Sequence, residues 1–308
     1  MSLKNSLISI VIRAYNEEKH IKKLMEGVFN QDIGEPFEVI VVDSGSTDKT
    51  LDIISNYQVK IVHIAPKQFS FGYSLNRGIK ESKGDYLVFI SAHCYPKRKD
   101  WLKSIIRPFE DDKVGLVYGK QRGNHLTKFS EQQIFYKLFP EQSMLIQKIP
   151  FCSNANAAIR CSIWKKIPYD ETLTGLEDLD WANKILKFGY HIFYNSDAEI
   201  IHVHEESLKQ IFRRYERESI ALKKIFPETS FNFLDFLRLC SSNLILDYLR
   251  ALKSDRKMRD FWEIPIFRFL QFWGTYKGYN YKKPITDEVK RYFYYPRPIK
   301  KFSKKKNI

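Results

Sequence analysis

The sequence has little of several features that would assign a protein to a class at once. Its 308 residues hold four cysteines and no CxxC pair, which excludes a disulfide scaffold and a zinc ribbon and predicts a reducing compartment. No stretch approaches the roughly 18 apolar residues that a membrane-spanning helix needs. The mostly polar residues 2–5 (SLKN) follow Met1 where a secreted precursor would have an apolar core, so we expect a cytoplasmic protein.

The two common phosphate-binding signatures are also missing. Residues 13–17 (RAYNE) stand where a dinucleotide-binding chain would have GxGxxG after its first strand. No GxxxxGK[ST] occurs anywhere in the sequence. A dinucleotide-binding protein and a P-loop protein are therefore not supported.

Charge is abundant but unevenly placed. The composition, 44% hydrophobic and 28% charged, is that of a folded globular protein, and the net charge is +15. Residues 205–308 hold 24 Lys and Arg against 12 Asp and Glu, whereas residues 1–204 hold 27 against 24. The basic C-terminal part therefore predicts an anionic partner, which charge alone cannot identify as nucleic acid, lipid or substrate.

The N-terminal part alternates Val- and Ile-rich runs with segments of helical composition. We expect strands at residues 7–12, 37–43, 59–64, 86–90 and 114–118 and helices at 17–29, 47–57, 73–81 and 101–110. Continuous apolar strands separated by helices predict an α/β fold with a mostly parallel sheet covered on both faces. Such sheets bind ligands at the carboxyl ends of their strands.

The second expected strand leads into Asp43 and the polar residues 44–50 (SGSTDKT). One interpretation is a well-capped turn, in which Ser46 or Thr47 caps the next helix. The other is that Asp43, at a strand end, binds a nucleotide base. The motif alone leaves both open.

Five ordered motifs together resemble family 2 inverting glycosyltransferases of the GT-A fold. They are VIRAYNE at 11–17, VVDSGSTDKT at 41–50, SLNRG at 74–78, GDYLVFI at 84–90 and EDLDWA at 177–182. Further segments are most similar to the rhamnosyltransferase-like bacterial members: FSFG at 69–72, SAH at 91–93, SNAN at 153–156, HVH at 202–204 and FRRY at 212–215.

The resemblance implies an enzyme that moves a sugar from a nucleoside-diphosphate donor, dTDP or UDP, to a glycan or lipid-linked acceptor in capsule or O-antigen synthesis. It implies a catalytic domain at 1–204, with a nucleotide-binding half to about 119 and an acceptor half from about 120, and a basic helical extension at 205–308. The implied nucleotide-binding residues are Ala14, Tyr15, Glu17, Asp43, Ser44, Asn76, Arg77, Ser91, Ala92 and His93.

The usual Asp-x-Asp of the fold family is replaced here by Ser91-Ala92-His93. By resemblance, His93 with His202 or His204 would bind the divalent cation, Mn²⁺ or Mg²⁺, that neutralises the donor diphosphate. Imidazole in place of carboxylate favours softer metals. The alternatives are histidines that bind the diphosphate directly, or a structural role for His93.

By resemblance, Asp178 is the general base of the transfer, with Glu177 beside it on the acceptor side. Acidic residues are also expected in a first helical turn because of the helix dipole, and Asp180 is a less favoured base. Arg213 and Arg214 match positions near the donor phosphates. Candidate acceptor contacts are Trp181, Lys120 and Asn154, although a buried core position is the alternative for Trp181.

Aromatic and basic residues mix in the segments 231–252 and 261–281 and end in KKFSKKK at 300–306. This pattern fits attachment to an anionic membrane at the cytoplasmic face of the inner membrane, and equally a helical subdomain or homodimer contact. No nucleic-acid motif is present, so we expect no nucleic-acid partner. Rival functions are a non-catalytic nucleotide-sugar-binding scaffold and a sugar nucleotidyltransferase, whose Gly-rich loop is absent.

Overall fold

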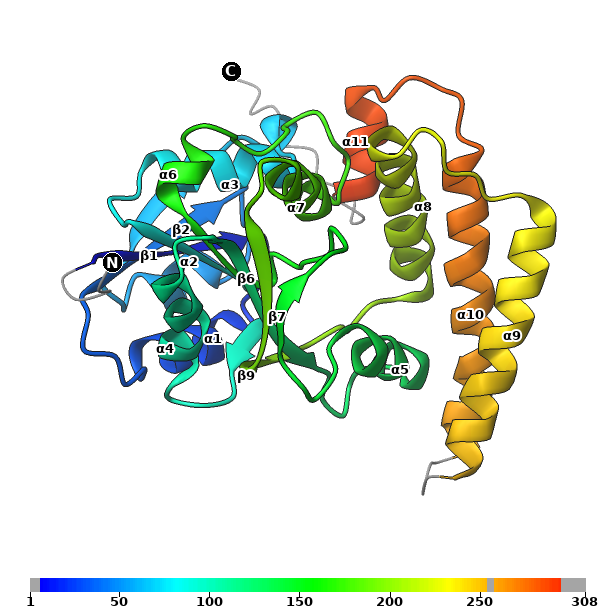
Figure 1. Ribbon diagram of the computed structural model, residues 1–308. Coiled ribbons are helices and arrows are strands. Elements are labelled where there is room, and N and C mark those ends of the chain that lie inside the picture. Colours follow the sequence, from blue (N-terminus) through cyan, green and yellow to red (C-terminus); the bar gives the residue numbers. More distant parts are fainter. Residues whose placement is uncertain (1–5, 254–257, 295–308) are drawn as a thin grey trace, which may run out of the picture.

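The computed structural model describes residues 6–253 and 258–294 (Figure 1). An α/β part carries the sheet, and a layer of C-terminal helices stands along one side of it. The strands are β1 Ile8–Ala14, β2 Phe37–Asp43, β3 Lys60–His63, β4 Tyr86–Ser91, β5 Cys94–Pro96, β6 Val114–Arg122, β7 Met144–Gln147, β8 Asn156–Arg160 and β9 His191–His202. The α-helices are α1 Ile21–Phe29, α2 Thr50–Ile54, α3 Phe71–Lys80, α4 Trp101–Ile106, α5 Phe129–Leu138, α6 Cys161–Trp164, α7 Glu177–Lys187, α8 Leu208–Ile225, α9 Phe233–Leu252, α10 Met258–Tyr279 and α11 Asp287–Tyr294.

Within the described residues the strands form one sheet in the order β3-β2-β1-β4-β8-β6-β9-β5, with β7 paired to β9. β1 lies between β2 and β4, and all three run parallel, as does the pair β2 and β3. This confirms the α/β class and places the carboxyl ends of β1, β2 and β4 side by side.

The second half of the sheet is mixed. β8 is antiparallel to both β4 and β6, while β6 and β9 are parallel. The register of β6 and β9 shifts between Gly119, which pairs with Asn195, and Gln121, which pairs with Ile200. β9 therefore contains a bulge at residues 196–199.

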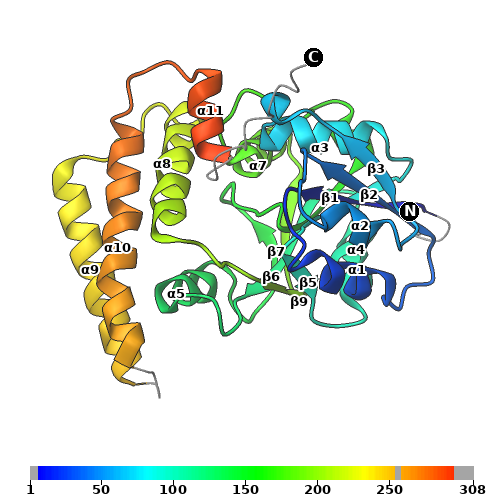
Figure 2. The ribbon, with the colours of Figure 1, turned by 180° about the vertical axis from the view of Figure 1, so that it is seen from behind.

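Two hydrophobic cores cover the two faces of the sheet. On one face, Ile21 and Leu24 of α1 and Trp101 of α4 are fully buried against β1 and β4. On the other, Leu75 of α3 and Trp181 of α7 are buried against the same strands. Figures 1 and 2 show these helices on either side of the strands, so the predicted coverage of both faces is confirmed.

The boundary that we predict at residue 204 falls between β9 and α8. Helices α8, α10 and α9 lie side by side, with α10 in the middle (Figures 1 and 2). A buried ion pair joins α9 to α10, because the Arg268 guanidinium donates to both carboxylate oxygens of Asp247 at 2.7 and 3.0 Å. None of the helices in the described ranges is long and apolar enough to cross a membrane.

Candidate active site

The carboxyl end of β2 presents Asp43, whose side chain is only 2% exposed. Its oxygens accept hydrogen bonds from the backbone N–H groups of Gly45 at 3.0 Å and Ser46 at 3.2 Å. Ser44 donates its N–H to the Ala14 carbonyl at 3.1 Å and so ties the ends of β1 and β2 together. The expected nucleotide residues Ala14, Asp43 and Ser44 thus lie at one point of the sheet edge.

The loop after β1 is interlocked with the loop after β2. Asn16 adopts a left-handed conformation with φ 53°, which asparagine tolerates better than most residues. Its side chain accepts the N–H of Thr47 at 2.8 Å, and its N–H donates to Ser46 Oγ at 3.0 Å. Our prediction that Ser46 or Thr47 caps the following helix is wrong, because α2 begins at Thr50 and these side chains bond to Asn16 instead.

Three histidines converge beyond the end of β4. His93 Nε2 lies 3.1 Å from His202 Nε2, which lies 2.7 Å from His204 Nε2. The three nitrogens lie within 4.8 Å of one another. We expected His93 to lie beside either His202 or His204, and in the structure it lies in one cluster with both.

Each of these rings is oriented through its other nitrogen. The Nδ1 atoms of His93, His202 and His204 lie 3.0, 2.7 and 2.7 Å from oxygens of Glu17, Gln121 and Glu131 respectively. A carboxylate can only accept a hydrogen bond, so Nδ1 carries the proton on His93 and on His204 and leaves Nε2 as the inward-facing atom.

Burial and neighbouring charges set the ionisation of this cluster. Burial and the other two histidines hold the pKa of His202 well below its ordinary value. Burial also lowers the pKa of His93, but the Glu17 carboxylate outweighs it and raises that pKa overall. Although burial opposes it, the Arg214 guanidinium and His204 lower the pKa of Glu131 to about 2, so Glu131 stays ionised.

Glu177 and Asp178 follow a residue with a strained backbone conformation. Leu176 has φ 56° and ψ 29°, a conformation that is costly for a residue of its size, and α7 starts directly after it. Glu177 is buried and accepts a hydrogen bond from Arg13 Nη1 at 3.1 Å. Arg13 comes from the end of β1, so it connects α7 to the carboxyl edge of the sheet.

Asp178 is partly buried and held by backbone donors. The N–H groups of Asn154 and Leu179 donate to its two oxygens at 3.1 and 2.8 Å. Burial, followed by the Glu177 carboxylate, raises the pKa of Asp178 to about 7, against the opposing effect of those backbone hydrogen bonds and Arg13. A carboxylate with this pKa can both accept and release a proton near neutral pH.

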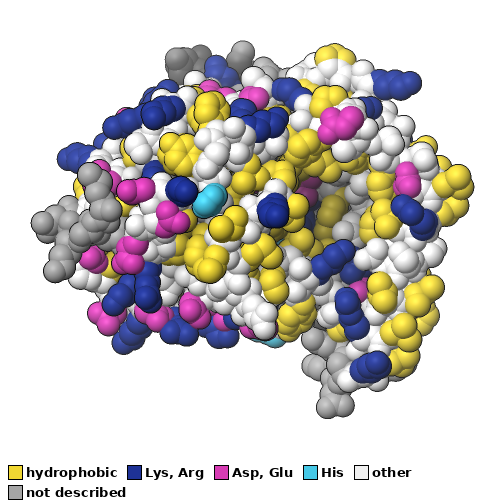
Figure 3. All heavy atoms as spheres, viewed as in Figure 1, with side chains coloured by type: hydrophobic (Ala, Val, Ile, Leu, Met, Phe, Trp, Pro, Cys, Tyr) yellow, Lys and Arg dark blue, Asp and Glu magenta, His cyan; other side chains and the backbone are white. Residues whose placement is uncertain are grey.

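Helix α8 brings arginines to the same region. The guanidinium groups of Arg13 and Arg217 lie over the Phe71 ring, 4.8 and 4.6 Å from its centroid. Arg213 is 7% exposed, stacks on the Tyr292 ring at 3.8 Å, and its Nε is buried without a hydrogen-bond partner among the described residues. Arg214 also has a buried Nε without a hydrogen-bond partner among the described residues, and its guanidinium forms ion pairs with Glu131 and Glu206. Figure 3 shows this face of the molecule hollowed between the α/β part and the C-terminal helices.

Two expected site residues are occupied elsewhere. The amide of Asn76 is 3% exposed; it donates to the carbonyl of Tyr169 and to Glu171 and accepts from Trp164. Trp181 is fully buried, and its Nε1 donates to the Ile167 carbonyl at 2.7 Å. The structure gives both side chains packing contacts in place of the nucleotide and acceptor contacts that we expected, so we leave them out of the proposed site.

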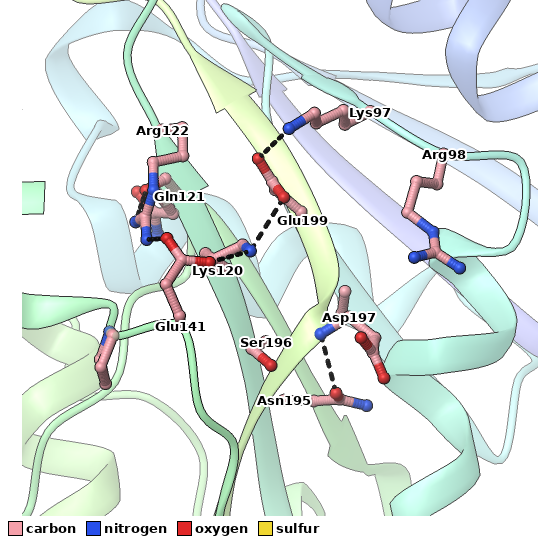
Figure 4. A network of polar contacts seen from close by, with 12 residues as sticks. Lys97, Arg98, Lys120, Gln121, Arg122, Glu141, Asn195, Ser196, Asp197 and Glu199 are labelled. Atoms are coloured by element: carbon pink, nitrogen blue, oxygen red, sulfur yellow. Dashed lines mark hydrogen bonds and ion pairs between the residues drawn. The ribbon is translucent and has the colours of Figure 1, made fainter. Parts of the chain in front are cut away.

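Lys120 lies in a separate polar network (Figure 4). Its Nζ is 2.9 Å from Glu141 and 3.0 Å from Glu199, and Arg122 also pairs with Glu141. These residues line a pocket with Lys97. Lys120 is thus neutralised by two carboxylates, whereas Asn154 lies directly against Asp178.

The remaining predicted residues stay near the sheet edge. Ser91 donates its N–H to the Ala155 carbonyl at 3.4 Å, and Ala92 is buried in the core. Arg77 and Tyr15 are partly buried on α3 and after β1. Sequence reasoning assigned no site role to Arg13 or Glu131, and it placed Gln121 only in a stretch that, by resemblance, lines the acceptor cleft. Residues 11–17 contain Arg13, but nothing local shows that it pairs with residue 177.

Comparison with known proteins settles the family. The sequence profile of glycosyl transferase family 2 matches residues 9–167, which is more than half of the chain. The chain belongs to glycosyl transferase family 2. The predictions of the family, of a GT-A fold and of an enzyme are thereby confirmed.

Named relatives of this family 2 glycosyltransferase are moderately similar. It is 29% identical over 198 residues to the O-antigen chain rhamnosyltransferase WbaN of Salmonella anatum, covering 61% of this chain and 63% of that protein. It is 28% identical over 230 residues to a dolichyl N-acetyl-alpha-D-glucosaminyl phosphate 3-beta-D-2,3-diacetamido-2,3-dideoxy-beta-D-glucuronosyltransferase of Methanococcus voltae, covering 68% of this chain and 70% of that protein.

Solved structures share the fold. The mannosyltransferase PcManGT of Pyrobaculum calidifontis, in complex with GDP-Man and Mn²⁺, has a TM-score of 0.60 at 17% identity, over 89% of this chain and 85% of that chain. TarS of Staphylococcus aureus, in complex with UDP-GlcNAc, has a TM-score of 0.53 at 20% identity, over 86% and 72%.

Proposed function

We propose that this enzyme transfers a sugar, with inversion, from a nucleoside-diphosphate sugar to a glycan or lipid-linked acceptor in the synthesis of a bacterial capsule or O-antigen. The observation that carries the proposal is Asp178, a partly buried carboxylate with a pKa near 7 at the start of α7. Arg13 acts on the pKa of both Asp178 and His93, which relates the base to the histidine cluster.

In this reaction the Asp178 carboxylate takes the proton of the acceptor hydroxyl. As that proton leaves, the hydroxyl oxygen forms a bond to the anomeric carbon from one face. The bond from that carbon to the diphosphate breaks on the opposite face, and the diphosphate leaves with the electron pair. Asp178 ends the step protonated, and the backbone N–H groups of Asn154 and Leu179 keep its oxygens in place throughout.

The donor is proposed to lie along the carboxyl ends of β1, β2 and β4. Asp43 would contact the base, and Ala14, Tyr15, Glu17, Ser44, Ser91 and Ala92 would line the nucleotide, with Arg77 nearby. The rhamnosyltransferase names among its relatives favour dTDP, and the TarS complex with UDP-GlcNAc keeps UDP as the second choice. Arg213 supports a diphosphate contact because its buried Nε lacks a partner among the described residues.

The histidine cluster fits a divalent cation. On His93 and His204 the Nδ1 proton is committed to a carboxylate, so their inward-facing Nε2 atoms meet His202 Nε2 as lone pairs. Three neutral imidazole nitrogens suit Mn²⁺ or a softer ion such as Zn²⁺ better than Mg²⁺. When bound, the cation would neutralise charge on the leaving diphosphate.

The test of the proposal is Asp178→Asn. We expect transfer to fall about 10²- to 10⁴-fold, since a general base contributes that much. Nucleotide binding, followed as a thermal shift, should stay within about twofold. The matched control is Asp180→Asn, two residues further along α7, whose carboxylate pairs with Lys184 at 2.7 Å.

An Asp178→Asn enzyme with full activity would overturn the proposal. Loss of nucleotide binding together with activity would make Asp178 structural. A chain that binds nucleotide sugars but neither transfers nor hydrolyses them would instead be the non-catalytic scaffold that we considered from the sequence.

A further inference from the structure

The outward side of α9 carries a stripe of exposed aliphatic residues. We define the α9 stripe as five of these residues, with exposed fractions of 73, 45, 58, 52 and 71%: Leu234, Leu237, Ile245, Leu249 and Leu252. Their spacings of three, eight, four and three residues keep them on one side of a helix of 3.6 residues per turn. The stripe therefore has two parts, Leu234 and Leu237 near the start of α9 and Ile245, Leu249 and Leu252 in its second half, with the exposed Ser241 between them on the same side.

The stripe does not pack within the described chain. Phe236, Asp247 and Ala251, on the other side of α9, are buried. Phe236 meets Phe269 and Trp273 of α10. A helix in a monomer normally exposes polar residues on the side away from the core, so five exposed aliphatic side chains in one line indicate a binding surface.

Basic side chains outnumber carboxylates on and next to α9. Arg238, Arg250 and Lys253 are exposed there, with Arg238 on the side of the stripe, Lys253 at its edge and Arg250 on the far side of the helix. α9 has only two carboxylates: Asp247 is buried with Arg268, and Asp235, in the first turn, lies 3.4 Å from Arg238. Along the edge where α9 lies, Figure 3 shows hydrophobic side chains alternating with Lys and Arg.

A neighbouring helix carries exposed apolar residues of its own. On α10, Trp262 is 74% exposed, and Ile266 and Phe269 are 45 and 48% exposed. Ile266 and Phe269 also line an open apolar groove against Leu208 and Phe212 of α8. Tryptophan and basic residues beside aliphatic ones are typical of helices that lie in the lipid–water interface.

The charge pattern distinguishes a lipid surface from a second copy of the chain. Pairing two α9 stripes would bring together two helical extensions, each with 24 Lys and Arg against 12 Asp and Glu over residues 205–308. Like charges brought together in this way oppose self-association. An anionic bilayer, in contrast, attracts this positive charge while the stripe enters its boundary layer.

We propose that the α9 stripe docks on the surface of an anionic lipid bilayer, with Arg238 and Lys253 contacting the headgroups. The proposal does not rest on the transfer reaction, and its failure would leave the proposed function untouched. It assigns the exposed side of the helical extension to lipid, and the hollow beside α8 to substrates.

The experiment uses the full chain with vesicles of phosphatidylcholine alone or with about one third phosphatidylglycerol, followed by co-sedimentation. We expect binding to the anionic vesicles only, weakened in high salt because screening removes the headgroup attraction. The double variant Leu249→Ser, Leu252→Ser should lower binding at least about tenfold. Arg238→Gln with Lys253→Gln should lower it by several fold.

The matched control is Leu145→Ser. Leu145 is 67% exposed, like the leucines of the stripe, but it lies on β7 and not on α9. Circular dichroism and thermal unfolding show that each variant folds. Unchanged vesicle binding in the leucine variant, or equal binding to neutral and anionic vesicles, would overturn the proposal. So would a wild-type dimer in light scattering that dissociates in the same variant while vesicles are not bound.

Discussion

At the residue scale, the two neighbouring carboxylates of α7 differ in what holds them. Glu177 faces the Arg13 guanidinium at 3.1 Å, whereas Asp178 meets only neutral N–H donors. Of these two adjacent carboxylates, the one without a cationic hydrogen-bond partner, Asp178, titrates near neutrality. The side chain with the free proton-accepting capacity is therefore Asp178.

This difference predicts the pH dependence of the transfer. Asp178 must be ionised to act as a base, so kcat should rise with pH and reach half of its plateau near pH 7. Glu177→Gln removes the neighbouring negative charge that raises the Asp178 pKa, so the rising limb should move to lower pH. The measurement is the kcat profile from pH 5 to 9 for both enzymes.

Asp180→Asn serves again as the control and should leave that limb in place. A wild-type profile that is flat between pH 6 and 8 would contradict the assignment of the base. A Glu177→Gln limb that moves to higher pH would contradict the electrostatic origin of the shift.

The residues of the histidine cluster show how far a sequence can predict a site. His93, His202 and His204 were found because family motifs mark their positions. Gln121 and Glu131, which orient two of the rings, lie about 70 to 80 residues away in sequence and follow no local pattern. Such partners depend on strand order and helix placement, which only the folded chain supplies.

At the element scale, the helical extension is held by a close crossing of α8 and α10. Gly274 and Gly278 lie one turn apart on α10, and a Cβ on Gly278 would stand 2.3 Å from the Glu216 carbonyl oxygen of α8. These two small residues let the helix backbones meet. Side chains at either position would push the layer away from the α/β part.

Gly278→Ala should therefore destabilise the protein. Overpacking against backbone costs about 1–3 kcal/mol, and the better helix propensity of alanine returns up to about 1 kcal/mol. We expect the thermal midpoint to fall by about 2–6 °C. Gly34→Ala is the control, because no atom lies within 4 Å of its added Cβ, and it should leave the midpoint unchanged.

The strands also differ in how well the sequence predicts them. β2 and β4 were predicted within one or two residues because their Val and Ile runs are continuous. β8, with the sequence NAAIR, was not predicted because alanine and asparagine have weak strand preference. Its antiparallel place between β4 and β6 is fixed by long-range pairing, which gives no periodic signal.

At the scale of the whole molecule, the proposed binding region draws on distant parts of the chain: Asp43 from β2, His93 after β4, His202 and His204 from the end of β9, and the arginines of α8. An unfolded chain has no such arrangement. Ligands should therefore bind the native state selectively and raise its melting temperature.

A thermal-shift panel tests this directly. A ligand at a hundredfold excess over its Kd adds about 2.7 kcal/mol, or roughly 5–10 °C for a protein of this size. We expect Mn²⁺ or Zn²⁺ alone to raise the midpoint more than Mg²⁺, and dTDP or UDP to add to it. His93→Ala should abolish the metal shift, whereas His125→Ala, an exposed histidine outside the cluster, should preserve it.

Equal shifts by all cations in both variants would remove the histidines from the metal site. No shift by any nucleotide would contradict the donor site along β1 and β2.

The bulge in β9 determines which face of the sheet the end of that strand presents. Ile192 and Tyr194, before the bulge, belong to one hydrophobic core, while Ala198 and Ile200, after it, belong to the other. From the pair Gly119–Asn195 to the pair Gln121–Ile200, β6 advances two residues and β9 advances five, so β9 has three extra residues at this point. In a regular strand, residues 192, 194, 200 and 202 would share a face, so the bulge is what turns the end of β9 to the other face of the sheet. If β9 ran on as a regular strand with the same residues, His202 would lie on the face that carries Ile192 and Tyr194, so a four-residue irregularity brings this histidine into the cluster.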